Sequence, residues 1–260
     1  MTRLALCLAL LAAPMAAPAR SGPWQVPEGC EIFLTVQSRG CRVSNHYRCA
    51  ADAQGDQWRA DFDQEGLFFL SRINFETEWV ESYETNPPTR QTLDPAPEDP
   101  ASFTELVTTG HDSYRFALSR DDGRRSHVVG SDRLTGRTFT VSGVTLEETE
   151  YEFTETDTMG NVLRREHGNE SISREMRLFF AGAGETDLGD GTWLPFDGSP
   201  VTLAFPGQPG FGSTRPLYEC DALTADAGGE ITRISAPLAS AGRGMARDTA
   251  MPPGQPVTRP

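Results

Sequence analysis

The four cysteines beyond residue 19 are the side chains whose type and spacing best suit chemistry. Cys41 and Cys49 stand eight positions apart in GCRVSNHYRC, with His46 between them. Zinc sites usually place ligand cysteines two to four residues apart, and a thiol redox pair requires Cys-x-x-Cys. Neither spacing occurs here. We therefore expect two disulfides formed in an oxidising compartment, and neither a metal site nor a cofactor.

The pairing of these cysteines has three possible connectivities. We interpret Ser44-Asn45-His46 as a hairpin turn, which would bring Cys41 close to Cys49. Cys30 would then pair with Cys220. Closing that long loop would remove denatured-state entropy worth on the order of 4–5 kcal/mol. This is the pairing we prefer of the three.

The carboxylates offer a second kind of chemistry, since two of them about 5–9.5 Å apart in a cleft can hydrolyse a glycosidic bond. Glu76, Glu78 and Glu81 adjoin Trp79 and Tyr83 in the sequence. A solvated strand edge is the preferred interpretation, and Glu78 and Glu81 are the catalytic candidates if it is wrong.

Other reaction classes lack their motifs. The sequence contains no G-x-S-x-G nucleophile elbow and no lysine, which excludes Schiff-base catalysis and a phosphate-loop lysine. The segment DFDQEG, 61–66, matches half of a calcium loop, but the twelfth position is Arg72 instead of a bidentate glutamate. We expect no calcium there.

The two ends of the chain differ from its middle. Residues 1–19 read as a secretory signal peptide, with an apolar run from Leu4 to Ala13 and cleavage after Ala19. Residues 221–260 contain no aromatic side chain, and we expect a disordered tail. A single antiparallel β domain is expected over 20–220, in the periplasm or secreted. No later segment is long and apolar enough to predict a transmembrane helix.

The formal net charge of the chain is −14, which argues against nucleic acid as a partner. A protein partner cannot be identified from the sequence.

Alternating apolar and polar residues recur in short segments spaced about 8–14 residues apart. This pattern predicts an all-β antiparallel meander, either a curved open sheet or a barrel or sandwich, stapled by disulfides. One short helix is expected in ASFTELVTT, with Asp99 as its cap and Pro100 at its first position.

The apolar side chains of such a sheet are expected to point inward. We predict a non-enzymatic protein that binds a small apolar or amphipathic ligand, or an envelope component. The alternatives are a hydrolase using Glu78 and Glu81, and a protein–protein interaction module. The ligand would contact the inner aromatic residues Trp58, Phe62, Phe69, Trp79, Tyr151, Phe153 and Phe180.

The segments GDQWRADFDQEG, RINFETEWVESY and PLYEC, within Cys30–Cys220, resemble a family of secreted alphaproteobacterial proteins that has no assigned activity. The resemblance implies export and a shared disulfide pattern, and it transfers no functional residue. The meander with one helix is also similar, at the level of fold alone, to periplasmic lipoprotein carriers.

Overall fold

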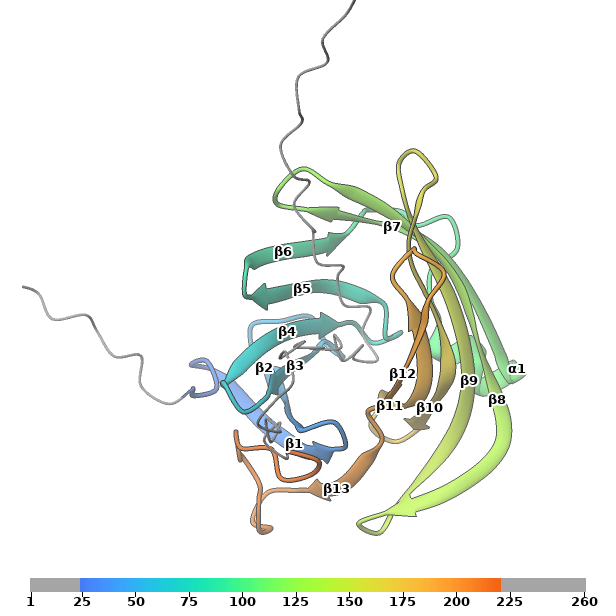
Figure 1. The fold of residues 1–260 in the computed structure, drawn as a ribbon. Coiled ribbons are helices and arrows are strands. Elements are labelled where there is room, and N and C mark those ends of the chain that lie inside the picture. Colours follow the sequence, from blue (N-terminus) through green and yellow to red (C-terminus); the bar gives the residue numbers. More distant parts are fainter. Residues whose placement is uncertain (1–23, 221–260) are drawn as a thin grey trace, which may run out of the picture.

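The computed structural model describes residues 24–220, and within them one antiparallel sheet of thirteen strands (Figure 1). The expected signal peptide and tail lie outside the described residues. The strands are β1 (Cys30–Ser38), β2 (Arg42–Cys49), β3 (Gln57–Phe62), β4 (Leu67–Ile73), β5 (Trp79–Thr85), β6 (Pro88–Leu93), β7 (His111–Arg120), β8 (Arg125–Val141), β9 (Val144–Asp157), β10 (Val162–Ser173), β11 (Leu178–Asp187), β12 (Trp193–Asp197) and β13 (Pro200–Ala204). The prediction of an all-β meander is confirmed.

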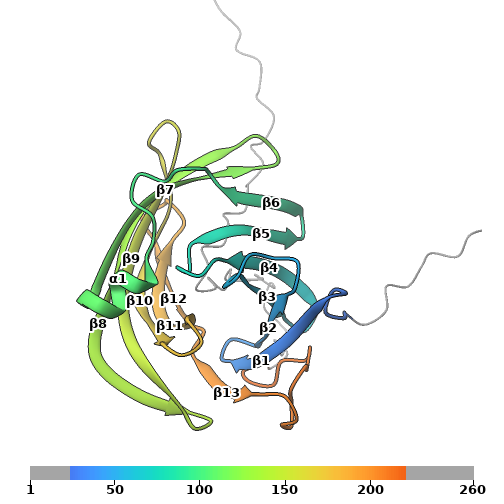
Figure 2. The same cartoon turned by 180° about the vertical axis from the view of Figure 1, so that it is seen from behind.

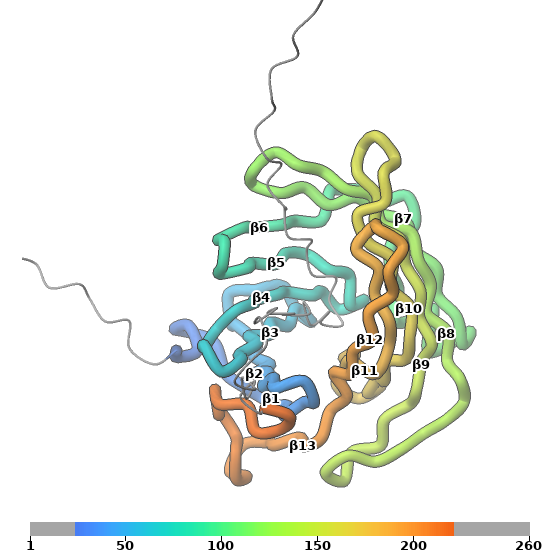
Figure 3. The backbone as a smooth tube through the Cα atoms, in the orientation of Figure 1, coloured from blue at the N-terminus to red at the C-terminus, as the bar shows by residue number. Residues whose placement is uncertain are grey.

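The sheet is curled but open. Strands β1 to β12 pair in chain order, and β13 then crosses over to pair with β1 (Figure 3). β1–β6 lie on one side and β8–β12 on the other, so the two halves face each other across a concave inner face. Among the described strands, β12 pairs with β11 alone and β13 with β1 alone, which leaves the sheet open between β12 and β13.

A glycine in β8 allows an aromatic ring of β7 to lie close to the backbone on this inner face. Gly130 of β8 lies opposite Tyr114 of β7. A Cβ atom at Gly130 would stand 2.6 Å from the Tyr114 ring and 2.5 Å from the carbonyl oxygen of Glu152. The Tyr114 ring therefore lies against the bare backbone of β8, as happens where a strand lacks a side chain.

The outer face of β2–β4 has an apolar layer of its own. Trp58, Ala60 and Phe62 share one side of β3 as predicted, but that side is the outer one, where the Phe62 ring lies 5.1 Å from Trp24. Arg59 and Asp61 point inward instead. The expectation that Phe62 faces inward is therefore wrong, because the segment before β1 covers the outer side of these strands. The Trp58 ring stacks with Tyr47 on this outer side, although Trp58 also borders the inner cavity.

The helix α1 (Phe103–Thr109) forms where a helix was predicted and contacts β7 and β8 (Figure 2). Its cap is Ser102, whose hydroxyl accepts from the Glu105 N–H, and it ends at Gly110 in the left-handed conformation with φ of 86°. The prediction of an Asp99 cap is wrong, because Asp99 forms a β-bridge with Arg115.

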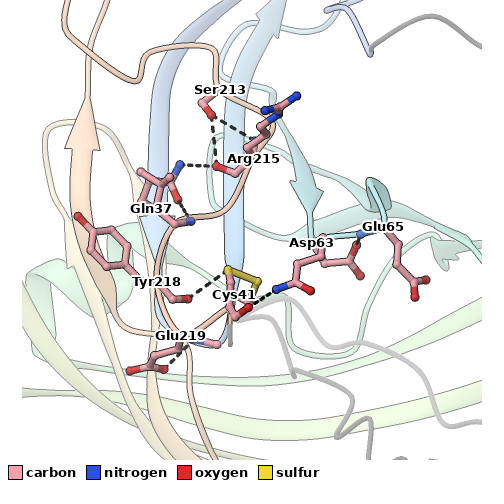
Figure 4. Close-up of a disulfide and its surroundings, with 12 residues drawn as sticks. Gln37, Cys41, Asp63, Glu65, Ser213, Arg215, Tyr218 and Glu219 are labelled. Atoms are coloured by element: carbon pink, nitrogen blue, oxygen red, sulfur yellow. Dashed lines mark hydrogen bonds between the residues drawn. A yellow bond between two sulfur atoms is a disulfide. The ribbon is translucent and has the colours of Figure 1, made fainter. Parts of the chain in front are cut away.

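The disulfides join Cys30 to Cys49 and Cys41 to Cys220, so the preferred pairing is wrong. Figure 4 shows the disulfide at Cys41. Cys30 and Cys49 are directly opposed across the β1–β2 hairpin. The turn lies at Arg39–Cys41 instead of Ser44–His46, which are residues of β2. Cys41 is consequently at the hairpin tip, with φ of 55°, and within reach of the last described residue.

The segment after β13, residues 205–220, crosses the outer side of β1 and β2, and we call it the strap. Gln37 donates to the Arg215 carbonyl and accepts from the Leu217 N–H, both at 3.0 Å (Figure 4). Asn45 donates to the Ser213 carbonyl at 2.9 Å. Buried polar side chains of the first hairpin thus hold the strap, and the Cys41–Cys220 disulfide fixes its end.

Candidate functional site

The inner face encloses a cavity of about 90 Å³ between the two halves of the sheet. This volume is smaller than the roughly 150 Å³ of an engineered cavity that holds benzene, and it suits a ligand of a few heavy atoms. Its walls come from nearly every part of the fold: His46, Gln57, Trp58, Arg59, Ser71, Ile73, Thr77, Trp79, Ala101, Phe103, Asp112, Tyr114, Asp132, Tyr151, Phe153, Glu166, Glu170, Leu178 and Phe179.

Two carboxylates meet in this cavity because their strands are paired in register. Asp112 of β7 lies opposite Asp132 of β8, and directly opposed side chains on a sheet have Cβ atoms roughly 5 Å apart. Asp112 is 3% exposed. Its Oδ2 accepts from the Ser102 N–H at 3.0 Å, whereas its Oδ1 accepts no hydrogen bond within residues 24–220.

Burial raises the pKa of Asp112 to about 7, and the nearby charges of Asp132, Glu105 and Asp99 act in the same direction. The hydrogen bond from Ser102 opposes them. Near neutral pH this carboxyl group can therefore both release and accept a proton.

A tyrosine and a second carboxylate lie beside this pair. The Tyr151 hydroxyl donates to Glu166 Oε1 at 2.6 Å, and Arg164 approaches Glu166 at 3.8 Å while its guanidinium lies over the Phe153 ring. Burial and the charge of Glu166 raise the pKa of Tyr151. The phenol therefore stays protonated and acts as a hydrogen-bond donor.

The opposite wall carries His46 and Arg59. Burial, with the adjacent charges of Arg59 and Arg42, lowers the pKa of His46 to about 3, so its imidazole is neutral. Arg59 lies 3.1 Å from Asp61. A cation is thus already matched with a carboxylate on this side.

The aromatic residues predicted to bind a ligand are divided by the structure. Trp58, Trp79, Tyr151 and Phe153 line the cavity, although the Trp58 ring stacks with Tyr47 and Tyr83 of the outer face. Phe62, Phe69 and Phe180 do not line it. Phe69 packs in the inner cluster with Trp79, and Phe180 packs with Leu34 in the other inner cluster.

Glu81, one of the two weaker catalytic candidates, lies on the outer face. It accepts hydrogen bonds from Arg72 at 2.6 Å, Arg90 at 2.8 Å and the Tyr83 hydroxyl at 2.6 Å. Burial alone would raise the pKa of Glu81, but these donors together hold it below the usual value. The other candidate, Glu78, accepts from the Asn74 amide at 2.7 Å. Neither lines the inner cavity.

Glu81→Gln should lower the free energy of unfolding by about 1.5–3 kcal/mol, because the charge that three donors surround is lost. Urea denaturation measures this, with the exposed Glu65→Gln as the control, for which we expect less than about 0.5 kcal/mol. Equal stability of the two variants would contradict the structural role of Glu81.

The inner carboxylates were missed in the sequence, although a signal for them exists. Asp112 has the same strand parity as Tyr114, Phe116 and Leu118, which alternate toward the inner face. Strict alternation therefore places Asp112 among the buried aromatics. Asp112 was instead assumed to face water, because carboxylates usually do.

A second, wider groove of about 540 Å³ lies over the outer side of β7–β10. His111, Arg133, Glu150 and Glu152 on its rim are exposed, and Glu150 pairs with Arg133. Because its charged groups are solvated and of both signs, the inner cavity is the better candidate site.

No family model, curated protein or solved structure matches the chain. Within residues 24–220, no helix has the length and apolar character needed to cross a membrane. In the same residues, no group of three or more His, Cys, Asp or Glu side chains is arranged to hold a metal ion.

Proposed function

We propose that this protein is an exported, non-enzymatic binding protein that takes a small amphipathic ligand into the cavity of the inner face. The observation that carries the proposal is the meeting of aromatic rings from β5, β7 and β9 with buried carboxylates around one cavity of about 90 Å³. Aromatic walls with a few placed polar groups are typical of small-molecule sites. The size favours a compact molecule over a lipid chain.

Export is part of this proposal. Two disulfides among residues 24–220 support an oxidising compartment, where such bonds persist. The signal peptide expected at 1–19 supports the periplasm or the exterior. Neither feature bears on the identity of the ligand.

The hydrolase alternative at Glu78 and Glu81 receives no support from the geometry. A general acid needs a carboxyl group that keeps its proton near neutral pH. Hydrogen bonds from Tyr83, Arg90 and Arg72 hold the pKa of Glu81 low, so it is ionised.

Native mass spectrometry of the mature protein purified from its own host tests the proposal. The native mass should exceed the denatured mass by one discrete adduct. Ala101→Leu should abolish that adduct, because Ala101 lines the cavity and the larger side chain would fill it. Ala117→Leu makes the same change at a buried alanine that does not line the cavity, and it should retain the adduct.

Equal native and denatured masses would contradict the proposal. An adduct that Ala101→Leu retains would place the ligand elsewhere and would also contradict it. Circular dichroism of each variant establishes that the loss of an adduct is not a loss of fold.

A further inference from the structure

We propose that the ligand of the inner cavity is a small organic cation, a protonated or methylated amine, held between the Asp112 and Asp132 carboxylates and the surrounding aromatic rings. This inference rests on the proposed binding function and names the chemical class of the ligand.

The first argument is the charge of the cavity wall. Asp112, Asp132, Glu166 and Glu170 contribute four carboxylates to the lining, whereas Arg59 contributes its one guanidinium. His46 adds no charge, because its pKa of about 3 keeps it neutral. Behind the lining, Arg164 approaches Glu166 and the charge of Arg42 acts on Glu170. Asp112 and Asp132 lie together on the side of β7 and β8, across the cavity from Arg59.

The second argument is the free acceptor of Asp112. Its side chain is 3% exposed and lines the cavity, and its Oδ1 accepts no hydrogen bond within the described part of the chain. A buried acceptor without a donor costs roughly 1–3 kcal/mol. An ammonium N–H group, or a methylated ammonium in direct contact, would satisfy this oxygen. A purely apolar ligand would leave it as it is, and an anion would be repelled.

The third argument is the nature of the remaining wall. Trp79, Tyr114, Tyr151 and Phe153 line the same cavity. Aromatic faces attract cations through the ring quadrupole, and enclosed rings are the usual site for quaternary ammonium groups. The described residues offer no cluster of three metal-ligating side chains, so the structure favours an organic cation over a metal ion.

Proton competition gives the proposal a second signature. Four groups are close to Asp112: Asp132 on β8, Glu105 on α1, Asp99 before that helix, and the Ser102 N–H. The titratable and charged groups on the other walls of the cavity are Glu166, Glu170, Arg59 and His46. With a pKa of about 7, Asp112 is mostly protonated at pH 6 and mostly ionised at pH 8. A cation that binds the ionised form should therefore bind about tenfold more tightly at pH 8 than at pH 6.

The test is calorimetric titration of the mature protein, freed of any co-purified ligand by refolding or dialysis, in phosphate buffer. The probes are methylammonium, trimethylammonium and tetramethylammonium, with tert-butanol as a neutral molecule of similar shape. We expect at least one of the cations to bind at least tenfold more tightly than tert-butanol. Asp112→Asn should weaken that cation at least tenfold and remove the dependence on pH. Glu98→Gln, at an exposed carboxylate, should change neither.

Binding of tert-butanol as tight as that of the cations would overturn the inference, and so would unchanged affinity in Asp112→Asn. Failure of all three cations to bind would overturn it as well. The comparison with tert-butanol uses the unaltered protein, so it stands even if a variant fails to fold. If the native protein carries an adduct that Ala101→Leu removes while no cation binds, the proposed function survives and only the chemical class is wrong.

Discussion

Replacing Cys41 and Cys220 with serine should lower the free energy of unfolding by up to about 5 kcal/mol. The disulfide joins residues 179 positions apart, and in the chain-entropy treatment the stabilisation grows with the length of the closed loop. The strap would then be held without a covalent bond. What remains are its hydrogen bonds to Gln37, Thr35 and Asn45 and the contacts of Tyr218 and Glu219 with the hairpin tip. Urea denaturation of the oxidised protein measures the loss.

The other disulfide is the matched control. Cys30 and Cys49 are 19 positions apart, so Cys30→Ser with Cys49→Ser should cost about 3 kcal/mol. A loss below about 1 kcal/mol in the Cys41 and Cys220 variant would mean that the strap is fixed without the covalent bond. A larger loss for the short loop would contradict the entropic argument.

Asp112→Asn should make the protein more stable at pH 8, by up to about 4 kcal/mol. The pKa of Asp112 is raised from 3.8 to about 7 in the folded state, so the folded chain binds this proton more tightly than the unfolded chain does. The contribution of Asp112 to stability therefore falls as the pH rises from about 4 to 7. An asparagine keeps the shape of the side chain without this charge.

Denaturation midpoints at pH 4, 6 and 8 in phosphate or acetate buffers, which contain no amine, test this prediction. The two proteins should have similar stability at pH 4 and diverge as the pH rises. Glu98→Gln, at an exposed position, should follow the unaltered protein throughout. Parallel curves for Asp112→Asn and the unaltered protein would contradict the burial of a costly charge at this position.

Buried carboxylates that cost stability in this way cluster at functional sites. Residues kept for function often destabilise the fold, and their replacement then increases stability at the expense of activity. The two experiments on Asp112 are therefore complementary, since we expect the same substitution to stabilise the chain and to weaken the binding of the cation.

The strands were predictable because alternation is a local signal. Tyr114, Phe116 and Leu118 repeat every second residue and share one buried face. The helix before Gly110 was also found from local residues, although its cap is Ser102 and not Asp99. These features depend on neighbours within a few positions of each other. No distant residue is needed to account for them.

The position of the first turn could not be found in this way. Ser44-Asn45-His46 has turn-forming residues, yet Asn45 is fully buried in β2 and bonds to Thr35 and to the Ser213 carbonyl. The partner that satisfies Asn45 comes from the strap, 168 positions later. A prediction from neighbouring residues alone therefore puts the turn at the wrong place. A turn at Ser44–His46 would bring Cys41 close to Cys49, which is why the predicted disulfide pairing was also wrong.

The prediction of which side of β3 faces inward was wrong for a similar reason. Alternation separates Phe62 from Arg59 correctly, but it does not say which side is enclosed. Trp24 packs on Phe62 at the outer face of the sheet, whereas Asp61 pairs with Arg59 at the inner face. The polar inner face departs from the general rule that charged groups lie outside, and departures of this kind are expected where a protein binds something.

The disulfide pairing also dictates an order of events during folding. A ribosome makes Cys30, Cys41 and Cys49 long before Cys220, and the native arrangement joins Cys30 to Cys49 while passing over the cysteine between them. Cys41 must therefore be a free thiol when the last strand has joined β1 and the strap has reached the hairpin tip. An oxidant that joined cysteines in the order of their synthesis would make Cys30–Cys41 first, and thiol–disulfide exchange would have to undo it. We therefore expect a disulfide isomerase, added beside an oxidant, to speed the formation of the native pairing.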